Sequence, residues 1–146
     1  LGAVDLQDWD LVAASISEAT WLKTPGGIRF LDGQDGVLVF LWPEDNTHYS
    51  VGLMHSPPWP DTDGFIHHGL ELEDALMAAE DVIQSYGKLP LRNAPWRRKG
   101  QPSEGQLRMA RSLGIPDADN KTRARLSDDI STALATKRLD PYLKGN

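Results

Sequence analysis

Five short apolar segments, each ended by turn residues, most restrict what the first half of this chain can fold into. They are ATWLK (19–23), GIRFL (27–31), GVLVFLW (36–42), HYSVGLM (48–54) and GFIHHGL (64–70). Their β-branched and aromatic residues favour strands, and the Pro, Gly, Asp and Asn residues between them are typical of turns. The pattern therefore predicts an antiparallel meander of strands.

The segment at 36–42 is apolar at almost every position, which is typical of a central strand covered on both faces. The helix predicted over 72–86 is the candidate cover. Its apolar residues recur at helical spacing and are Leu72, Leu76, Ala79, Ile83 and Tyr86. A further helix is predicted around residues 8–19, and its apolar side consists of Trp9, Val12 and Ile16.

The second half begins with a basic, Pro-rich segment at 88–102, which we expect to be an extended and mobile linker. Ser103 and Gln106 then form a capping box that starts a helix, and Gly114 ends it in a left-handed conformation. A second helix is predicted through 121–138. Its expected buried side consists of Leu126, Ile130, Ala133 and Leu134.

The fold class that follows is α+β, in which an antiparallel sheet with a packed helix precedes a small C-terminal helical subdomain. We expect an acidic sheet-and-helix domain at 1–87, the linker at 88–102 and the basic helical subdomain at 103–146.

The net charge of −6 conceals two parts of opposite sign. Residues 1–87 hold 15 acidic and two basic residues, a net charge of −13, whereas residues 88–146 hold 13 basic and six acidic residues, a net charge of +7. Such asymmetry favours separate surfaces for separate partners. The alternative is that both parts are solvated surface whose opposite charges help them to dock.

Composition also limits the compartment that we expect for the chain. It has no Cys, which excludes disulfides and thiolate sites and favours a reducing, cytoplasmic setting. No apolar run approaches the roughly 20 residues of a membrane span, and the first residues do not resemble a signal peptide. Because the chain begins with Leu1, we expect it to be a piece of a longer protein.

Motifs that carry catalysis are missing from the sequence. There is no GxxxxGK[ST] loop, no GxGxxG after a predicted strand and no nucleophile elbow. His67 and His68 are adjacent on a predicted strand, where neighbouring side chains point to opposite faces, so they form no simple metal or catalytic pair. We therefore expect no catalytic residue, metal or cofactor, and no enzymatic activity of this chain alone.

Four motifs in the second half together resemble a known module. They are APWRRK (94–99), PSEGQL (102–107), LGIP (113–116) and LSDDISTALA (126–135). The stretch 94–137 is similar to a small helical module near the C-termini of bacterial and phage DNA-processing proteins, including DEAD/DEAH-type superfamily 2 helicases. Arg125 replaces the Glu that would complete a second capping box in that pattern, and Leu126 replaces a small Ala. The resemblance implies a DNA-related context and a motor outside this chain.

The resulting hypothesis is a non-catalytic accessory domain that contacts nucleic acid weakly, DNA rather than RNA, beside a parent or partner helicase. The contact residues that we expect are Trp96, Arg97, Arg98, Lys99, Arg108, Arg111, Lys121, Arg123 and Arg125. The alternative is a protein–protein adaptor, in which the acidic sheet docks a basic partner or the parent protein and Trp96 is a buried anchor.

Overall fold

The computed structural model describes the backbone of residues 2–144 and the side chains of residues 9–143. Two compact units are present. Unit 1 comprises Leu1–Trp21 and Ile28–Leu91, and unit 2 comprises Leu22–Gly27 and Arg92–Asn146. The fold is α+β, as predicted, with an antiparallel sheet and a C-terminal helical part. No helix within the described residues is long and apolar enough to cross a membrane.

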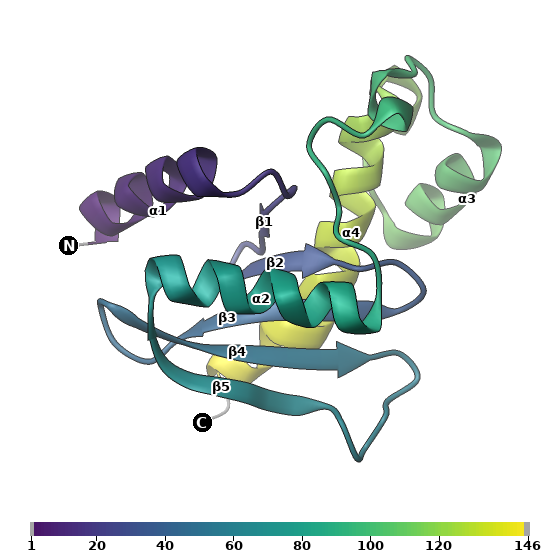
Figure 1. Ribbon diagram of the computed structural model, residues 1–146. Helices are drawn as coiled ribbons and strands as arrows, with labels where there is room; N and C mark the ends of the chain where they lie inside the picture. The colour runs from purple at the N-terminus through teal and green to yellow at the C-terminus, as the bar shows by residue number, and fades with distance from the viewer. Residues whose placement is uncertain (1, 145–146) are drawn as a thin grey trace. The chain divides into compact units, whose positions relative to one another are not determined.

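Strands β2 to β5 of unit 1 pair in chain order, each antiparallel to the next (Figure 1). Their bounds are Arg29–Asp32, Val37–Pro43, His48–His55 and Gly64–Glu71. The predicted meander is therefore confirmed. Every residue from Val37 to Leu41 is buried, which confirms that β3 is covered on both faces.

Helix α2 (Leu72–Tyr86) has the bounds that its periodicity predicts, and it lies across one face of the sheet (Figure 1). Its buried residues pack with alternate strand residues in one core, whose members include Leu76, Ala79, Ile83, Val39, Leu41, Val51 and Leu53. Tyr86 was expected on the buried stripe but is 37% exposed. At the last turn of the helix, its ring meets the side chain of His55 on β4 edge to face.

Helix α1 (Gly2–Ile16) confirms the predicted N-terminal helix and packs against α2. Trp9 is buried and meets Trp21 edge to face, with ring centroids 5.4 Å apart. Ile16, however, is 42% exposed, and the buried side continues through Ala13 and Ser17 instead. The Ser17 hydroxyl bonds Glu80 of α2, which turns this side of the helix end inward.

On the face of the sheet opposite α2, the ring of Phe40 on β3 occupies space that a glycine on the neighbouring strand leaves open. Phe40 pairs with Gly52 of β4, and a Cβ built on Gly52 would lie 2.2 Å from Cζ of the Phe40 ring. The ring also meets Trp42 and Phe65 edge to face. Gly52 thus provides the space that lets Phe40 lie flat on this face of the sheet.

Unit 2 contains strand β1 (Leu22–Lys23) and a series of helices (Figure 1). These are η1 (Pro95–Arg98), α3 (Glu104–Leu113), η2 (Ala118–Asn120), α4 (Arg123–Leu139) and α5 (Pro141–Lys144). The two predicted C-terminal helices are therefore confirmed. The expectation of an extended linker is wrong over Pro95–Arg98, which form a 3₁₀ helix packed against α4.

Both ends of α3 are formed by local hydrogen bonds. The Ser103 hydroxyl accepts from the Gln106 amide, and the Gln106 side chain accepts from the Ser103 amide, which completes the capping box. At the other end Gly114 has φ 74°, as predicted, and the Ile115 amide donates to the Ala110 carbonyl. These bonds form a Schellman motif that closes the helix.

Helix α4 does not present the single buried stripe that its sequence predicts. Leu126 is buried, but Leu134 is 40% exposed, and the other buried residues are Ala135 and Leu139. Leu126 and Ala135 lie about 180° apart around a helix of 3.6 residues per turn. The helix packs on opposite sides along its length, since it contacts η1 and α3 and also β1 and α5.

A carboxylate at the end of α4 holds the segment 22–27 in unit 2. Asp140 accepts hydrogen bonds from the Thr24 hydroxyl, at 2.6 Å, and from the Gly26 amide, at 3.0 Å. Thr24 and Gly26 precede Asp140 by 116 and 114 residues in the sequence. Their contact explains why unit 2 begins with a segment from the N-terminal half of the chain.

Candidate nucleic-acid interface

All nine predicted contact residues lie in unit 2, but they differ in what they bind there. Arg97 on η1 makes a bidentate ion pair with Asp128 of α4, at 2.9 and 2.7 Å. The hydrogen bond to Asp128 raises the pKa of Arg97, and both side chains are less than a quarter exposed. Arg97 therefore joins η1 to α4, which leaves its charge largely neutralised.

Lys121 and Arg125 share a second carboxylate. Nζ of Lys121 lies 2.6 Å from Oδ2 of Asp129, and Nε of Arg125 lies 3.3 Å from Oδ1. The Thr122 hydroxyl accepts from the Arg125 amide and caps α4 alone, because Arg125 stands where a Glu would bond back. Its side chain reaches Asp129 one turn later instead.

Arg123 is also occupied, because its Nε donates to the Gln101 carbonyl at 2.8 Å. This bond ties the start of α4 to the segment before α3. Together with the carboxylates of Asp128 and Asp129, it assigns four of the eight predicted cations to contacts that hold unit 2 together. The surface that remains for phosphate is smaller than the sequence predicts.

The other four cations are Arg98, Lys99, Arg108 and Arg111, and all are exposed. Within the side chains that the structure describes, none of them has a carboxylate partner. Arg111 bonds only the Leu107 carbonyl of its own helix, at 3.4 Å. Arg98 and Lys99 lie at the end of η1, and the two α3 cations line a shallow hollow with Glu104 and Leu107.

Trp96 lies next to these cations and is not buried. It is 36% exposed, and the Arg97 guanidinium lies 5.3 Å from its ring centroid. The Arg97 guanidinium thus covers part of the indole, and the rest faces solvent. Partial exposure permits stacking on an unpaired base, which a fully buried tryptophan would not.

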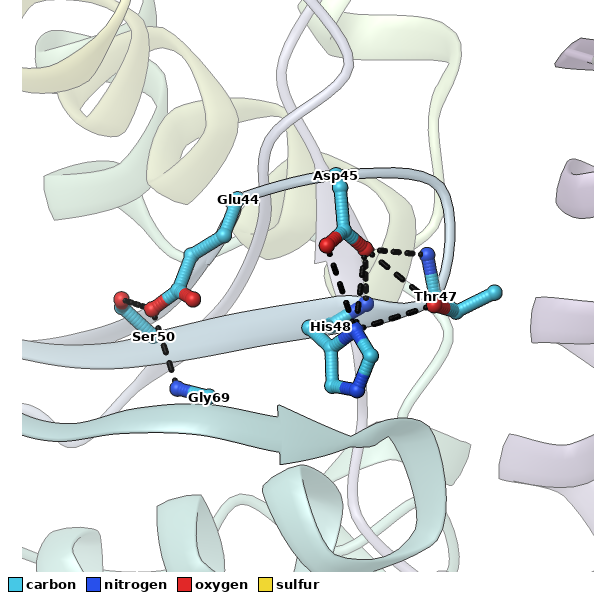
Figure 2. Close-up of polar contacts among 6 residues, drawn as sticks. All are labelled: Glu44, Asp45, Thr47, His48, Ser50 and Gly69. Atoms are coloured by element: carbon cyan, nitrogen blue, oxygen red, sulfur yellow. Dashed lines mark hydrogen bonds and ion pairs between the residues drawn. The ribbon is translucent and has the colours of Figure 1, made fainter.

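Unit 1 carries polar clusters that sequence reasoning did not assemble. In the turn between β3 and β4, Asp45 accepts from the amides of Thr47 and His48 and contacts the His48 ring (Figure 2). The hydrogen bond from the Thr47 amide is the largest influence, and the pKa of Asp45 falls to about 2. An Asp two or three residues before the amides is a signal for such a turn.

Glu44 forms a second cluster with Ser50 and Gly69 (Figure 2). Its carboxylate accepts from the Ser50 hydroxyl and from the Gly69 amide, and these bonds lower its pKa. His68 lies 3.0 Å from the same hydroxyl. This set resembles a Ser–His–Glu arrangement only in composition, because the buried hydroxyl donates its proton to the carboxylate rather than to the imidazole.

His67 and His68, which are adjacent on β5, have different neighbours. His67 pairs across the ladder with Val51, whereas His68 contacts Ser50 and Glu44. Among the described residues, no three His, Asp or Glu side chains converge on a point where they could hold a metal ion.

A search of protein-family models, of curated proteins and of solved structures finds no match to this chain.

Proposed function

We propose that the chain is a non-catalytic accessory domain of a DNA-processing, helicase-like protein, and that unit 2 contacts nucleic acid weakly. The observation that carries this proposal is a set of exposed cations that have no carboxylate partner among the side chains of residues 9–143: Arg98, Lys99, Arg108 and Arg111. They lie on a unit that holds 13 basic and six acidic residues. The resemblance of residues 94–137 to helicase-associated modules supports the same context.

Four free cations favour a weak contact rather than a tight one. Each phosphate that is neutralised releases about one counterion. A plot of the logarithm of the binding constant against the logarithm of the salt concentration should therefore have a negative slope no steeper than about −4. Unit 1, at −13, repels phosphate and opposes long-range attraction. We expect a Kd of about 10⁻⁴ to 10⁻⁶ M for oligonucleotides of any sequence.

Two lysines of unit 2 provide a matched test. Lys99→Ala and Lys121→Ala remove the same charge from the same residue type, but only Lys121 is bonded to a carboxylate. In anisotropy titrations with labelled single- and double-stranded DNA, Lys99→Ala should weaken binding and reduce the salt slope by about one. Lys121→Ala should leave the slope unchanged. Equal effects, or no salt-sensitive binding by the wild type, would contradict the proposal.

A second candidate function is a protein–protein adaptor, in which the acidic unit 1 docks a basic partner or the parent protein. The observation that favours it is the excess of 15 acidic over two basic residues in this unit. Its test is a titration of a labelled basic peptide with the chain in the absence of DNA, because a basic peptide also binds DNA directly. Binding of the peptide would support the adaptor function, and no binding would contradict it.

A further inference from the structure

Trp59 lies on the loop between β4 and β5, and one face of its ring is already covered. Its indole stacks on the imidazole of His55, with centroids 3.8 Å apart and ring planes 4° from parallel. Trp59 is nevertheless 50% exposed. A large aromatic ring is thus held flat against the protein on one side while much of its surface faces solvent.

Asp63 holds this arrangement in place. Its Oδ2 accepts from the backbone amides of His55 and Trp59, at 3.0 and 2.9 Å, and its Oδ1 lies 2.5 Å from Nδ1 of His55. Burial opposes ionisation of Asp63, but these hydrogen bonds prevail and lower its pKa. The ring of Trp59 is therefore fixed before any ligand arrives, which reduces the entropy lost on binding.

A second aromatic ring borders the same place. Tyr86, at the end of α2, meets the His55 ring edge to face at 5.8 Å, and it is 37% exposed. Since Trp59 stacks on that imidazole and Tyr86 stands nearly perpendicular to it, the two exposed rings adjoin the same buried histidine. Tyr and Trp are the residue types that most often anchor protein interfaces.

The charges nearby decide what an exposed ring face would attract. Asp61 is exposed on the Trp59 loop. Asp35 is exposed beside Gly36, whose carbonyl accepts from the Ser56 amide at the start of that loop. Lys88, two residues after Tyr86, is the opposing cation, and unit 1 as a whole carries −13. An indole face binds either a base or a cation, and here the negative field disfavours phosphate and favours a cation.

The geometry points to a docking site for an Arg or Lys side chain from a basic segment of a partner protein, with the cation on the exposed face of Trp59, whose loop also carries the exposed Asp61. This inference rests on the adaptor function of unit 1 and gives it a location. It is independent of the nucleic-acid contact, which uses residues of unit 2.

The test uses the full chain labelled with ¹⁵N, in which each of the five tryptophans gives one indole signal. Trp59→Phe assigns the signal of Trp59. An oligoarginine peptide should shift this signal at low salt, whereas oligoglutamate and oligothymidylate should not. The affinity for the peptide should fall from the wild type to Trp59→Phe and fall further in Trp59→Leu. The Kd of Trp59→Leu should be about two- to fivefold higher than that of the wild type.

Two conservative variants keep the test valid if the Trp59 variants disturb the loop. Asp61→Asn should weaken peptide binding about twofold, because it removes an exposed negative charge two residues from Trp59 on the same loop. Asp74→Asn is the matched control, since it lies in the first turn of α2, about 18 Å along the helix from Tyr86. It should have no more than a small effect.

The site is refuted if the Trp59 signal does not respond, if both Asp variants act equally, or if oligothymidylate shifts the signal as the peptide does. A peptide that binds the chain without affecting Trp59 would refute this site and leave the adaptor function standing. Absence of any peptide binding would refute both. Self-association that moves the Trp59 signal without peptide would identify a second copy of the chain as the occupant and would also overturn the inference.

Discussion

The ion pair between Arg97 and Asp128 should contribute to the stability of unit 2 and not to nucleic-acid binding. Its two parallel hydrogen bonds measure 2.9 and 2.7 Å, and the side chains are 18% and 24% exposed. Exposed pairs contribute about 0.2–1 kcal/mol, and charge-assisted bidentate bonds with less solvent contribute more. We therefore expect a coupling free energy of about 1–2 kcal/mol between the two residues.

A double-mutant cycle measures this coupling. Arg97→Ala, Asp128→Ala and the double variant are unfolded in urea, and the midpoints are compared with that of the wild type. Trp96 is the one tryptophan of unit 2, so its fluorine signal after 5-fluorotryptophan labelling reports the unfolding of this unit. Each single variant should lose nearly as much stability as the double variant.

DNA titrations of the same variants distinguish the two roles of Arg97. Asp128→Ala should tighten DNA binding, because it frees the guanidinium and removes a negative charge. Arg97→Ala should leave the salt slope unchanged. A coupling near zero, or an Arg97→Ala slope reduced as much as that of Lys99→Ala, would refute the assignment of Arg97 to the fold.

Three further outcomes are expected. Gly52→Ala should lower the free energy of unfolding by about 1–3 kcal/mol, because the new Cβ meets the buried Phe40 ring; an unchanged urea midpoint would contradict this. Gly114→Val should cost about 1 kcal/mol or more at φ 74°, and an unchanged melting temperature would contradict the strain expected there. Asp45→Ala should lower the melting temperature above pH 4, and the difference from the wild type should shrink as the pH falls toward 2. The reason is that the pKa of Asp45 in the folded state is about 2, below the ordinary 3.8, so its hydrogen bonds stabilise the fold only while the carboxylate is ionised. A difference in melting temperature that stays constant with pH would contradict this reasoning.

Features that depend on neighbours along the chain could be predicted from the sequence. The bounds of α2 follow from its periodicity, and the ends of α3 follow from the Ser103 box and from Gly114. The burial of β3 on both faces follows from its uninterrupted apolar run. In each case the deciding interaction lies within a few residues, so the local pattern carries the information.

The candidate sites required the tertiary structure, because no repeating pattern or cap motif specifies their contacts: Asp128 lies 31 residues from Arg97, and Asp129 and Asp63 each lie eight residues from Lys121 and His55. Sequence alone established the basic composition of the second half, but which cations are free depends on Asp128 and Asp129, which bond Arg97 and Lys121 from another helix. Likewise, the sequence places Trp59 in a segment rich in Pro and Asp but does not show what its ring contacts. Only the structure shows that it stacks on His55 and that Asp63 holds that ring, because these contacts depend on how the loop after β4 folds against the end of its strand.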